Sequence, residues 1–333
     1  MAKLLRASRE TFVPAARPFC RALIPALVFF SLLILFTPAL AGPADSKPLT
    51  FGVLPVIQAL PLFVAKEAGL FEAQGVKVEL IAFRTALDKD VAMTTGNLDG
   101  YFGDLFTPLV LYAGGVDLRI AAQNFRTVQG SRMFAVVAAP GSGIKTLAEL
   151  ADVPVAASSN TIIDYVTHTL LQAAAIPENR IKTLEIKNIP LRLQMLLSGK
   201  VKAATLPEPL VTLAELKGGK VLADDGRSSL SSTVLVFSAA AIQNRGQEIE
   251  KFMSGYQRAV EAVNSRQPNV REIMNRSCNV PEPLWNSYPL PSFPPLSLPE
   301  KPHVQAAIDW LASQGILKSK PKYSDLVDGR FLR

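Results

Sequence analysis

Short apolar runs alternate along most of the chain with segments whose apolar residues recur at helical spacing. Residues 49–54 form an apolar run typical of a buried strand, whereas in 60–74 apolar residues such as Leu62, Ala65 and Leu70 recur as they do on one face of a helix. Strands and helices that alternate in this way form parallel sheets with right-handed crossovers. The same reasoning predicts strands at 76–83, 99–102 and 118–122 and helices at 85–95 and 105–113.

The order of elements in 51–115 recurs, with weaker sequence similarity, in 155–219. Thr107-Pro108-Leu109-Val110 in the first copy matches Glu208-Pro209-Leu210-Val211 in the second, and each copy ends on a Gly-Gly pair. Two copies of one α/β unit predict two similar lobes, and a cleft between lobes is where small molecules bind. The second copy predicts strands at 155–157, 181–186, 203–206 and 221–223 and helices at 161–175, 191–198 and 208–216.

Two apolar segments rich in β-branched residues predict how the chain passes between the lobes. Residues 133–139 carry it into the second lobe, and residues 233–238 carry it back. We therefore assign 46–138 and 228–333 to lobe 1 and 139–227 to lobe 2, with two crossings that act as a hinge around a ligand. Further helices are predicted at 247–264, 268–275 and 304–314.

The segment 281–302 contains eight prolines. Proline lacks the backbone N–H and has a fixed φ, so this density excludes regular structure. The simpler interpretation is a rigid strap laid over lobe 1, and a docking surface for a partner is the alternative.

Residues 1–41 are predicted to be a cleavable signal peptide. Basic residues precede an apolar run at 23–36, and Ala39-Leu40-Ala41 fits the cleavage site. The run is shorter than the roughly 20 residues that a membrane-spanning helix needs, although an uncleaved N-terminal anchor is the alternative. The segment before Cys20 does not fit lipidation. The expected location is therefore the periplasm.

The signal segment also accounts for most of the basic character of the chain. It carries five of the 35 basic residues and one of the 28 acidic residues, so without it the net charge falls from +7 to +3. No cluster of basic and aromatic residues remains to indicate nucleic-acid binding. Cys278 is then the single cysteine, which excludes an intramolecular disulfide.

The residues that would indicate catalysis are missing. The sequence has no G-x-S-x-G motif, and Ile144 separates Gly143 from Lys145 where a phosphate-binding loop needs them adjacent. His168 and His303 are the two histidines, too few with one cysteine to predict a metal site. We therefore expect no catalytic residues, no cofactor and no metal, with an enzyme on a two-lobed fold as the alternative.

Candidate binding residues follow from the predicted sheets. In an open parallel sheet, ligands lie beyond the carboxyl ends of the strands, among the loops that lead into helices. Those loops contain Pro55, Gln58, Arg84, Thr85, Asp104, Asn124, Ser158, Ser159, Asn160, Thr161 and Glu208.

The strongest of these candidates is 158–161, a polar loop at the start of a predicted helix. Its free N–H groups and the helix dipole suit a carboxylate, sulfonate or phosphate, and a simple helix cap is the alternative. Arg84 is either a bidentate anion ligand or a solvated residue. Glu208 either accepts a hydrogen bond from a ligand amine or complements its helix dipole. The apolar loop 55–59 would hold the body of the ligand, and 158–161 its charged end.

Several motifs in order resemble the periplasmic substrate-binding proteins of ABC importers. They are GLFEAQGVKVEL, the Gly96-x-x-Asp99 step, GGVDLRIAA, SGIKTLAEL, Pro207-Glu208-Pro209 and YSDLVDGRFL. More narrowly, the chain is similar to the nitrate/taurine/alkanesulfonate-type family, which includes binders of a thiamine pyrimidine precursor. The similarity extends from Thr50 to Leu332. It departs from the family at 151–154, where a Gly-Lys pair is usual, and at Lys202, where Asp is common.

The resemblance implies a type II periplasmic-binding-protein fold, with two parallel-type sheets flanked by helices and joined by two hinge crossings. It also implies a monomer that delivers a small, anionic organic molecule to a membrane permease and its ATPase. A ligand-sensing module for a membrane receptor is the alternative. Nitrate, sulfonate, carboxylate and pyrimidine-type ligands all remain open from sequence.

Overall fold

The computed structural model describes residues 47–226 and 230–332. The predicted signal peptide, residues 1–41, lies outside these ranges. Among the described residues, no helix is both long enough and apolar enough to cross a membrane. Cys278 is a buried free thiol.

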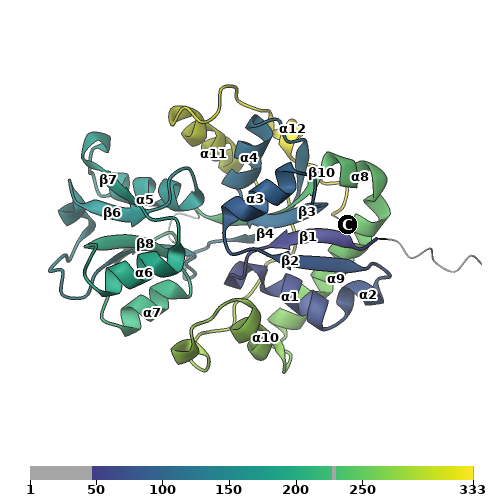
Figure 1. Ribbon diagram of the computed structural model, residues 1–333, viewed down its shortest axis with the longest axis horizontal. Helices are drawn as coiled ribbons and strands as arrows, with labels where there is room; N and C mark the ends of the chain where they lie inside the picture. The colour runs from purple at the N-terminus through teal and green to yellow at the C-terminus, as the bar shows by residue number, and fades with distance from the viewer. Residues whose placement is uncertain (1–46, 227–229, 333) are drawn as a thin grey trace, which may run out of the picture. The chain divides into compact units, whose positions relative to one another are not determined.

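The first sheet contains five strands in the order β2-β1-β3-β10-β4 (Figure 1). β1 is parallel to β2 and β3, whereas β10 is antiparallel to β3 and β4. The sheet is therefore mixed and not wholly parallel, because β10 returns from the second sheet in the opposite direction. Its strands are β1 (Leu49–Val53), β2 (Val78–Ala82), β3 (Gly100–Asp104), β4 (Leu118–Arg126) and β10 (Ser232–Ser238).

Helices cover both faces of this sheet, and we call the sheet with its helices the first lobe (Figure 1). Phe252 of α9 stacks on Phe71 with ring centroids 4.9 Å apart and also contacts Phe51 of β1 at 4.7 Å. The helix predicted at 60–74 is divided in two, because Gly69 has φ of +65°. The helices are η1 (Ile57–Ala59), α1 (Leu60–Glu67), α2 (Leu70–Ala73), α3 (Ala86–Thr94), α4 (Phe106–Ala113), α8 (Ala239–Asn244), α9 (Gly246–Asn264), α10 (Val270–Ser277), η4 (Glu282–Leu284), α11 (Lys301–Ser313) and α12 (Tyr323–Leu326).

The second sheet has the order β7-β6-β8-β5-β9, which repeats the topology of the first. β6 is parallel to β7 and β8, and β5 is antiparallel to β8 and β9. We call this sheet with its helices the second lobe. It contains β5 (Phe134–Ala138), η2 (Leu147–Leu150), β6 (Pro154–Ala157), α5 (Ile162–Ala173), η3 (Glu178–Arg180), β7 (Lys182–Glu185), α6 (Ile189–Leu197), β8 (Ala203–Pro207), α7 (Leu210–Leu216) and β9 (Lys220–Asp224).

Two crossings connect the sheets, one between β4 and β5 and the other between β9 and β10. They are hydrogen-bonded to each other: the N–H of Thr127 donates to the Ser231 carbonyl at 2.9 Å, and the Asp225 carboxylate accepts from the N–H groups of Met133 and Phe134. β5 belongs to the second sheet, so the first crossing ends before Phe134, earlier than the boundary predicted at 139. Paired crossings of this kind are a hinge geometry.

The proline-rich segment 281–302 lies along the first sheet. The N–H of Gln123 in β4 donates to the Ser297 carbonyl at 2.7 Å. Phe293 contacts Phe125 with centroids 5.7 Å apart and exchanges two hydrogen bonds with the Asn264 side chain of α9. These contacts make the segment a strap on the first lobe. Tyr288 of this segment is buried.

Candidate ligand-binding cleft

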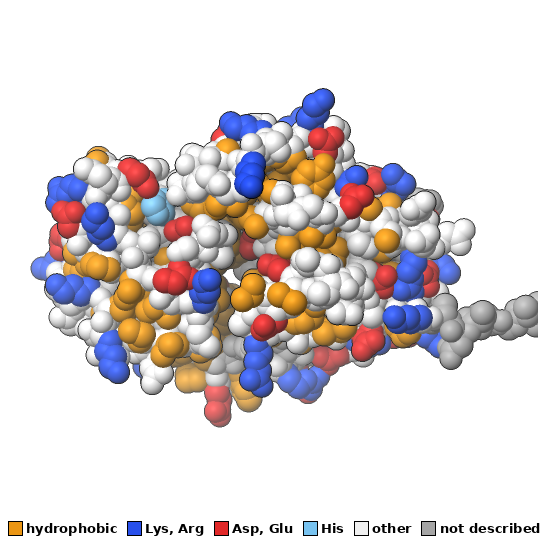
Figure 2. Space-filling view, turned by 45° about the horizontal axis from the view of Figure 1, so that its top comes forward, with side chains coloured by type: hydrophobic (Ala, Val, Ile, Leu, Met, Phe, Trp, Pro, Cys, Tyr) orange, Lys and Arg blue, Asp and Glu red, His pale blue; other side chains and the backbone are white. Residues whose placement is uncertain are grey.

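The carboxyl ends of the parallel strands of the two sheets face each other. Phe106, just after β3 of the first lobe, contacts Tyr165 in the first turns of α5, which follows β6 of the second lobe; the ring centroids are 4.8 Å apart. Trp310 of α11 packs edge-on against both rings at 5.5 Å. Figure 2 shows the surface hollowed where the lobes meet, with charged side chains around the hollow. This is the position at which open α/β sheets bind ligands.

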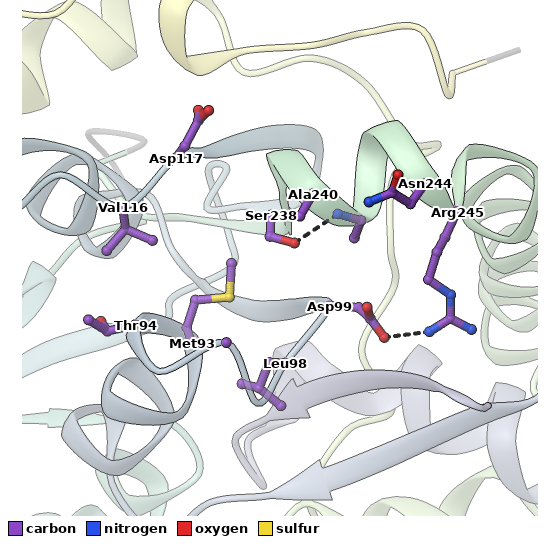
Figure 3. A pocket seen from close by; sticks show the side chains of 12 residues that line it. Met93, Thr94, Leu98, Asp99, Val116, Asp117, Ser238, Ala240, Asn244 and Arg245 are labelled. Atoms are coloured by element: carbon purple, nitrogen blue, oxygen red, sulfur yellow. Dashed lines mark hydrogen bonds and ion pairs between the residues drawn. The ribbon is translucent and has the colours of Figure 1, made fainter.

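A cavity of about 320 Å³ lies at the other edge of the first sheet, beside the amino end of β3 (Figure 3). Its charged groups already have partners within the chain. Asp99 accepts from the N–H of Thr50 at 2.8 Å and from Arg245 at 2.7 Å, and Arg245 also pairs with Glu248. We interpret this network as a clamp on the start of β1, and we place the candidate site in the cleft.

The loop predicted to bind an anion is occupied by carboxylates of the chain itself. Ser159 donates from its N–H at 2.8 Å, and from its hydroxyl, to Glu185 at the end of β7. The N–H of Asn160 donates to Asp164 at 3.0 Å, and the Thr161 hydroxyl caps α5. Three backbone donors at this helix start, the N–H groups of Ser159, Asn160 and Ile163, are therefore already engaged.

These two carboxylates give the loop a negative charge. Burial raises the pKa of Asp164 and outweighs the hydrogen bond from Asn160, which acts to lower that pKa. Burial acts in the same direction on Glu185, but the hydrogen bonds from Ser159 prevail and lower its pKa. Both groups repel a ligand anion placed at Ser159 or Asn160.

Ser158, the remaining residue of this loop, is backed by a buried cation. The guanidinium of Arg192 in α6 is fully buried and donates to the Ser158 hydroxyl, to the Ile186 carbonyl at 3.0 Å and to the Thr205 carbonyl at 2.9 Å. Burial lowers the pKa of Arg192 to about 10, although the negative charge of Glu185 acts to raise it. At a pKa of about 10 the guanidinium is still charged at neutral pH. Among the described residues no carboxylate forms an ion pair with it.

The orientation of the Ser158 hydroxyl follows from this contact. Arginine has no acceptor, so Ser158 must accept from Arg192, and its own proton remains to be donated. No side chain or carbonyl in 47–226 or 230–332 takes that proton. Ser158 therefore offers one hydrogen-bond donor, strengthened by the positive charge behind it, beyond the end of β6.

The first lobe also contains a buried cation. Lys89 of α3 is fully buried, with Nζ 2.5 Å from Asp90 and 3.7 Å from the centroid of the Tyr101 ring. Burial lowers the pKa of Lys89 and outweighs the negative charge of Asp90, which acts to raise that pKa. Aligning Gly96 with Gly199, without gaps, places Lys89 opposite Arg192. Sequence reasoning missed both residues, and this alignment was the signal that could have found them.

Two predicted acidic ligands are engaged within the chain. Asp104 accepts from the N–H of Phe106 at 2.8 Å and thereby caps α4. Glu208 is buried, pairs with Arg132 at 2.5 Å, and accepts from the N–H and hydroxyl of Thr212. Glu208 thus joins α7 to the crossing residue Arg132.

The remaining predicted residues lie on the first lobe. The Asn124 side chain donates to the Gln58 carbonyl at 3.0 Å, so β4 and η1 are brought together, and both residues are buried. Pro55 is half-buried beside them, and Thr85 caps α3. Arg84 is exposed and has no hydrogen-bond or ion-pair partner among the described residues. Those residues also contain no group of three or more side chains suited to hold a metal.

Solved structures with the same two-lobed architecture define the class. The alkanesulfonate-binding protein SsuA of Xanthomonas axonopodis pv. citri, bound to MOPS, has TM-score 0.71 and 19% identity over 86% of this chain and 99% of its own. The aliphatic sulphonate binding protein SsuA of Escherichia coli has TM-score 0.70 and 19% identity over 85% and 98%. The desulfurization enzyme DszB has TM-score 0.65 and 14% identity over 86% and 98%. At these identities the likeness establishes the fold, which is that of the periplasmic binding proteins, as predicted from sequence.

The family follows from the sequence itself. Residues 42–278 match the model of the NMT1-like family, and the chain belongs to that family. Among curated proteins, none matches the chain.

Proposed function

We propose that this protein is the extracytoplasmic solute-binding component of an ABC importer. One observation carries the proposal: the Phe106–Tyr165 contact brings together the loops beyond the carboxyl ends of both sheets, while two hydrogen-bonded crossings join the lobes. A hinge between two facing binding edges serves to close on a small molecule. We propose that it acts as a monomer that hands its ligand to a permease and its ATPase; among the solved structures that share the fold, one is described as the ligand-binding component of an ABC-type import system.

We place the anionic group of the ligand at Ser158. The buried charge of Arg192 acts through the Ser158 hydroxyl, whereas Glu185 and Asp164 disfavour an anion one or two residues further along the loop. On the first lobe, Pro55 and the buried Gln58 supply an apolar and amide wall for the body of the ligand. The ligand class supported by this arrangement is a small organic anion such as a sulfonate or carboxylate.

We propose no catalytic role, although DszB has the same fold. The thiol of Cys278 is buried and burial raises its pKa, so it supplies almost no thiolate. His168 lies between two acidic groups, 3.6 Å from Asp164 and 3.0 Å from Glu178, in an arrangement that stabilises α5. Neither residue is placed against the cleft donor Ser158.

The test is ligand binding by the purified protein. Small sulfonates, carboxylates, nitrate and phosphate are screened by thermal shift, since a ligand that binds only the native state raises Tm. For the best ligand, calorimetry should show affinity about tenfold weaker in Ser158→Ala, because a charge-assisted hydrogen bond is lost. Ser198→Ala, at the end of α6 in the same lobe, is the matched control.

Two outcomes count against the proposal. If no small anion raises Tm and mass spectrometry finds no co-purified small molecule, the solute-binding role is wrong. If a ligand binds but the loaded protein does not stimulate the ATPase of its importer, the ligand-sensing alternative replaces transport. Unchanged affinity in Ser158→Ala moves the anionic group elsewhere in the cleft.

A further inference from the structure

Three aromatic rings meet where the two lobes face each other, and we call them the aromatic cluster. The ring centroid of Tyr165 lies 4.8 Å from that of Phe106 and 5.5 Å from that of Trp310. Phe106 and Trp310 are 5.5 Å apart and meet edge to face, with 81° between their planes. Tyr165 belongs to the second lobe and the other two rings to the first, so two of the three contacts cross between the lobes.

Phe106 is fixed to the first lobe. It is buried and begins α4, which follows β3. Asp104, the last residue of β3, accepts hydrogen bonds from the N–H groups of Phe106 at 2.8 Å and Thr107 at 2.9 Å. Because these bonds tie the start of the helix to the end of the strand, the Phe106 ring has little freedom to follow a motion of the second lobe.

Trp310 is fixed to the first lobe through α11, which Figure 1 shows on that lobe at the side of the second. Before the helix, Glu300 pairs with Arg126 of β4 at 2.8 Å. After it, the N–H of Asp328 donates to the Ile120 carbonyl of β4 at 3.0 Å. The helix itself buries Val304, Ala307, Ile308 and Leu311. Attachments to β4 on both sides of α11 make Trp310 move with the first sheet.

Tyr165 is carried by the same helix as the proposed anion site. It lies on α5, seven residues after Ser158, and α5 starts directly after the loop 158–161. Val166, Leu170 and Leu171 are buried on the same helix and hold it in the second lobe. When the lobes move relative to each other, the Tyr165 ring therefore moves with Ser158.

The contacts between the lobes need no ligand, because all three rings belong to the chain. Aromatic pairs with centroids roughly 4.5 to 7 Å apart attract each other beyond the burial of their apolar area. Separation of the lobes breaks both contacts of Tyr165, whereas the contact between Phe106 and Trp310 survives because it lies within the first lobe. The aromatic cluster thus favours the closed arrangement.

We propose that the aromatic cluster is a latch, which holds a fraction of the protein closed before any ligand binds and so sets ligand affinity and release. The inference rests on the proposed function for the closing motion, and it adds what sets the closing equilibrium. Affinity at equilibrium rises with the population of the binding-competent form, whichever step comes first. A bound ligand leaves after the rings separate, so the latch also slows release.

Small-angle X-ray scattering tests the latch in the absence of ligand, on protein refolded from urea to remove any co-purified solute. Tyr165→Leu removes both contacts between the lobes and should give the larger increase in radius of gyration. Trp310→Leu removes one of them and should give a smaller increase. Tyr165→Phe keeps the ring and should match the unsubstituted protein. Trp285→Leu, which replaces the exposed tryptophan of the strap, is the matched control and should also match it.

Methanesulfonate and acetate are the probes for affinity, which calorimetry measures. For whichever probe binds, affinity should fall about tenfold in Tyr165→Leu and about threefold in Trp310→Leu, mainly through faster dissociation. Trp310 is the more decisive position, because the proposed function does not place it against the ligand. Ser158→Ala separates this test from that of the proposed function: it should weaken binding of the probe and leave the radius of gyration unchanged.

The latch is wrong if Tyr165→Leu keeps the radius of gyration of the unsubstituted protein, or if Tyr165→Phe is as expanded as Tyr165→Leu. It is also wrong if Trp310→Leu behaves like Trp285→Leu, and this comparison decides alone should Tyr165→Leu fail to fold. Should neither probe bind, the scattering decides, so failure of the solute-binding role does not conceal failure of the latch. Affinity lost in Tyr165→Leu without expansion would make Tyr165 a ligand contact and would contradict the latch.

Discussion

The two lobes have the same topology and use a buried cation at the same position in opposite ways. In the first lobe, Lys89 is neutralised by Asp90 at 2.5 Å and covers the Tyr101 ring. In the second lobe, Arg192 has no ion-pair partner among the described residues; it donates to two backbone carbonyls and to Ser158.

This difference shows how one α/β unit can be used for two tasks. A neutralised cation stabilises its lobe internally and contributes little field beyond the sheet edge. A cation held by carbonyls and a hydroxyl keeps its charge and transmits it through the hydroxyl. The comparison therefore supports an anion-binding role for the second lobe and a ligand-body role for the first.

The largest effect should come from removing these cations. Arg192→Met leaves two buried carbonyls without donors and should lower the free energy of unfolding by about 3 kcal/mol. Lys89→Met should lower it by only about 1 kcal/mol. Methionine fills the space of the apolar part of the lysine side chain, and the loss of the ion pair is largely offset because no charged group has to be desolvated on folding. Urea unfolding followed by circular dichroism measures both.

A double variant controls for the carboxylate that Lys89→Met leaves behind. Adding Asp90→Asn should recover part of the loss, since Asp90 then carries no unpaired charge. Equal losses in Arg192→Met and Lys89→Met would show that the two cations have the same structural role. The asymmetry between the lobes would then have to be assigned to other residues.

Sequence patterns predicted the fold well, because strand and helix periodicity depend on local apolar spacing. The repeated order and the strands that lead into helices are present. Residues 233–238, predicted as the return crossing, instead belong to β10 (Ser232–Ser238) of the first sheet, so the crossing lies before them. The mixed direction of each sheet was not predicted, since apolar runs carry no information on strand direction. The break at Gly69 was also missed, because a single glycine within an apolar helical pattern is ambiguous.

The site was less predictable, because it depends on side chains that meet only in three dimensions. Glu185 ends one strand and Ser159 follows another, and their hydrogen bond arises from the pairing of β6 with β7. Arg192 stands in the apolar segment LRLQMLL, where periodicity alone indicates a solvated face. A cavity of about 200 Å³ is lined both by Arg126 of β4 and by residues of α11, which is far away in sequence.

A smaller effect should test whether the lobes are equivalent where no ligand chemistry is involved. Gly96 and Gly199 end α3 and α6 with φ of +73° and +71°, and a Cβ at either would meet no atom within 4 Å. Gly96→Ala and Gly199→Ala should therefore each lower the free energy of unfolding by about 1 kcal/mol, from backbone strain alone.

The informative quantity for the two glycines is the difference between them. It should be close to zero in urea unfolding, in contrast to the difference between the two cation variants. Unequal losses would mean that one helix end has a role beyond the shared turn, and the alignment that pairs Lys89 with Arg192 would lose its support.

The smallest effects concern the two carboxylates at the start of α5, which should respond to pH with opposite signs. Burial raises the pKa of Asp164 in the folded protein, so its charged form opposes folding increasingly as pH rises from 3.8 through the raised pKa. Asp164→Asn, which keeps an acceptor for Asn160, should raise the free energy of unfolding at pH 7 by about 0.5 kcal/mol, and this gain should disappear below pH 3.8.

Glu185 should behave in the opposite way, because the hydrogen bonds from Ser159 lower its pKa against the effect of burial. Its stabilisation is complete above pH 4.5 and is lost as pH falls through the lowered pKa. The side chain is 41% exposed, so screening limits the loss in Glu185→Gln at pH 7 to about 0.5 kcal/mol or less. Urea unfolding at pH 7 and pH 3 distinguishes the two variants. If both shift stability in the same direction at pH 7, the carboxylates do not act as separate partners of Asn160 and Ser159, and the loop would regain free donors for an anion.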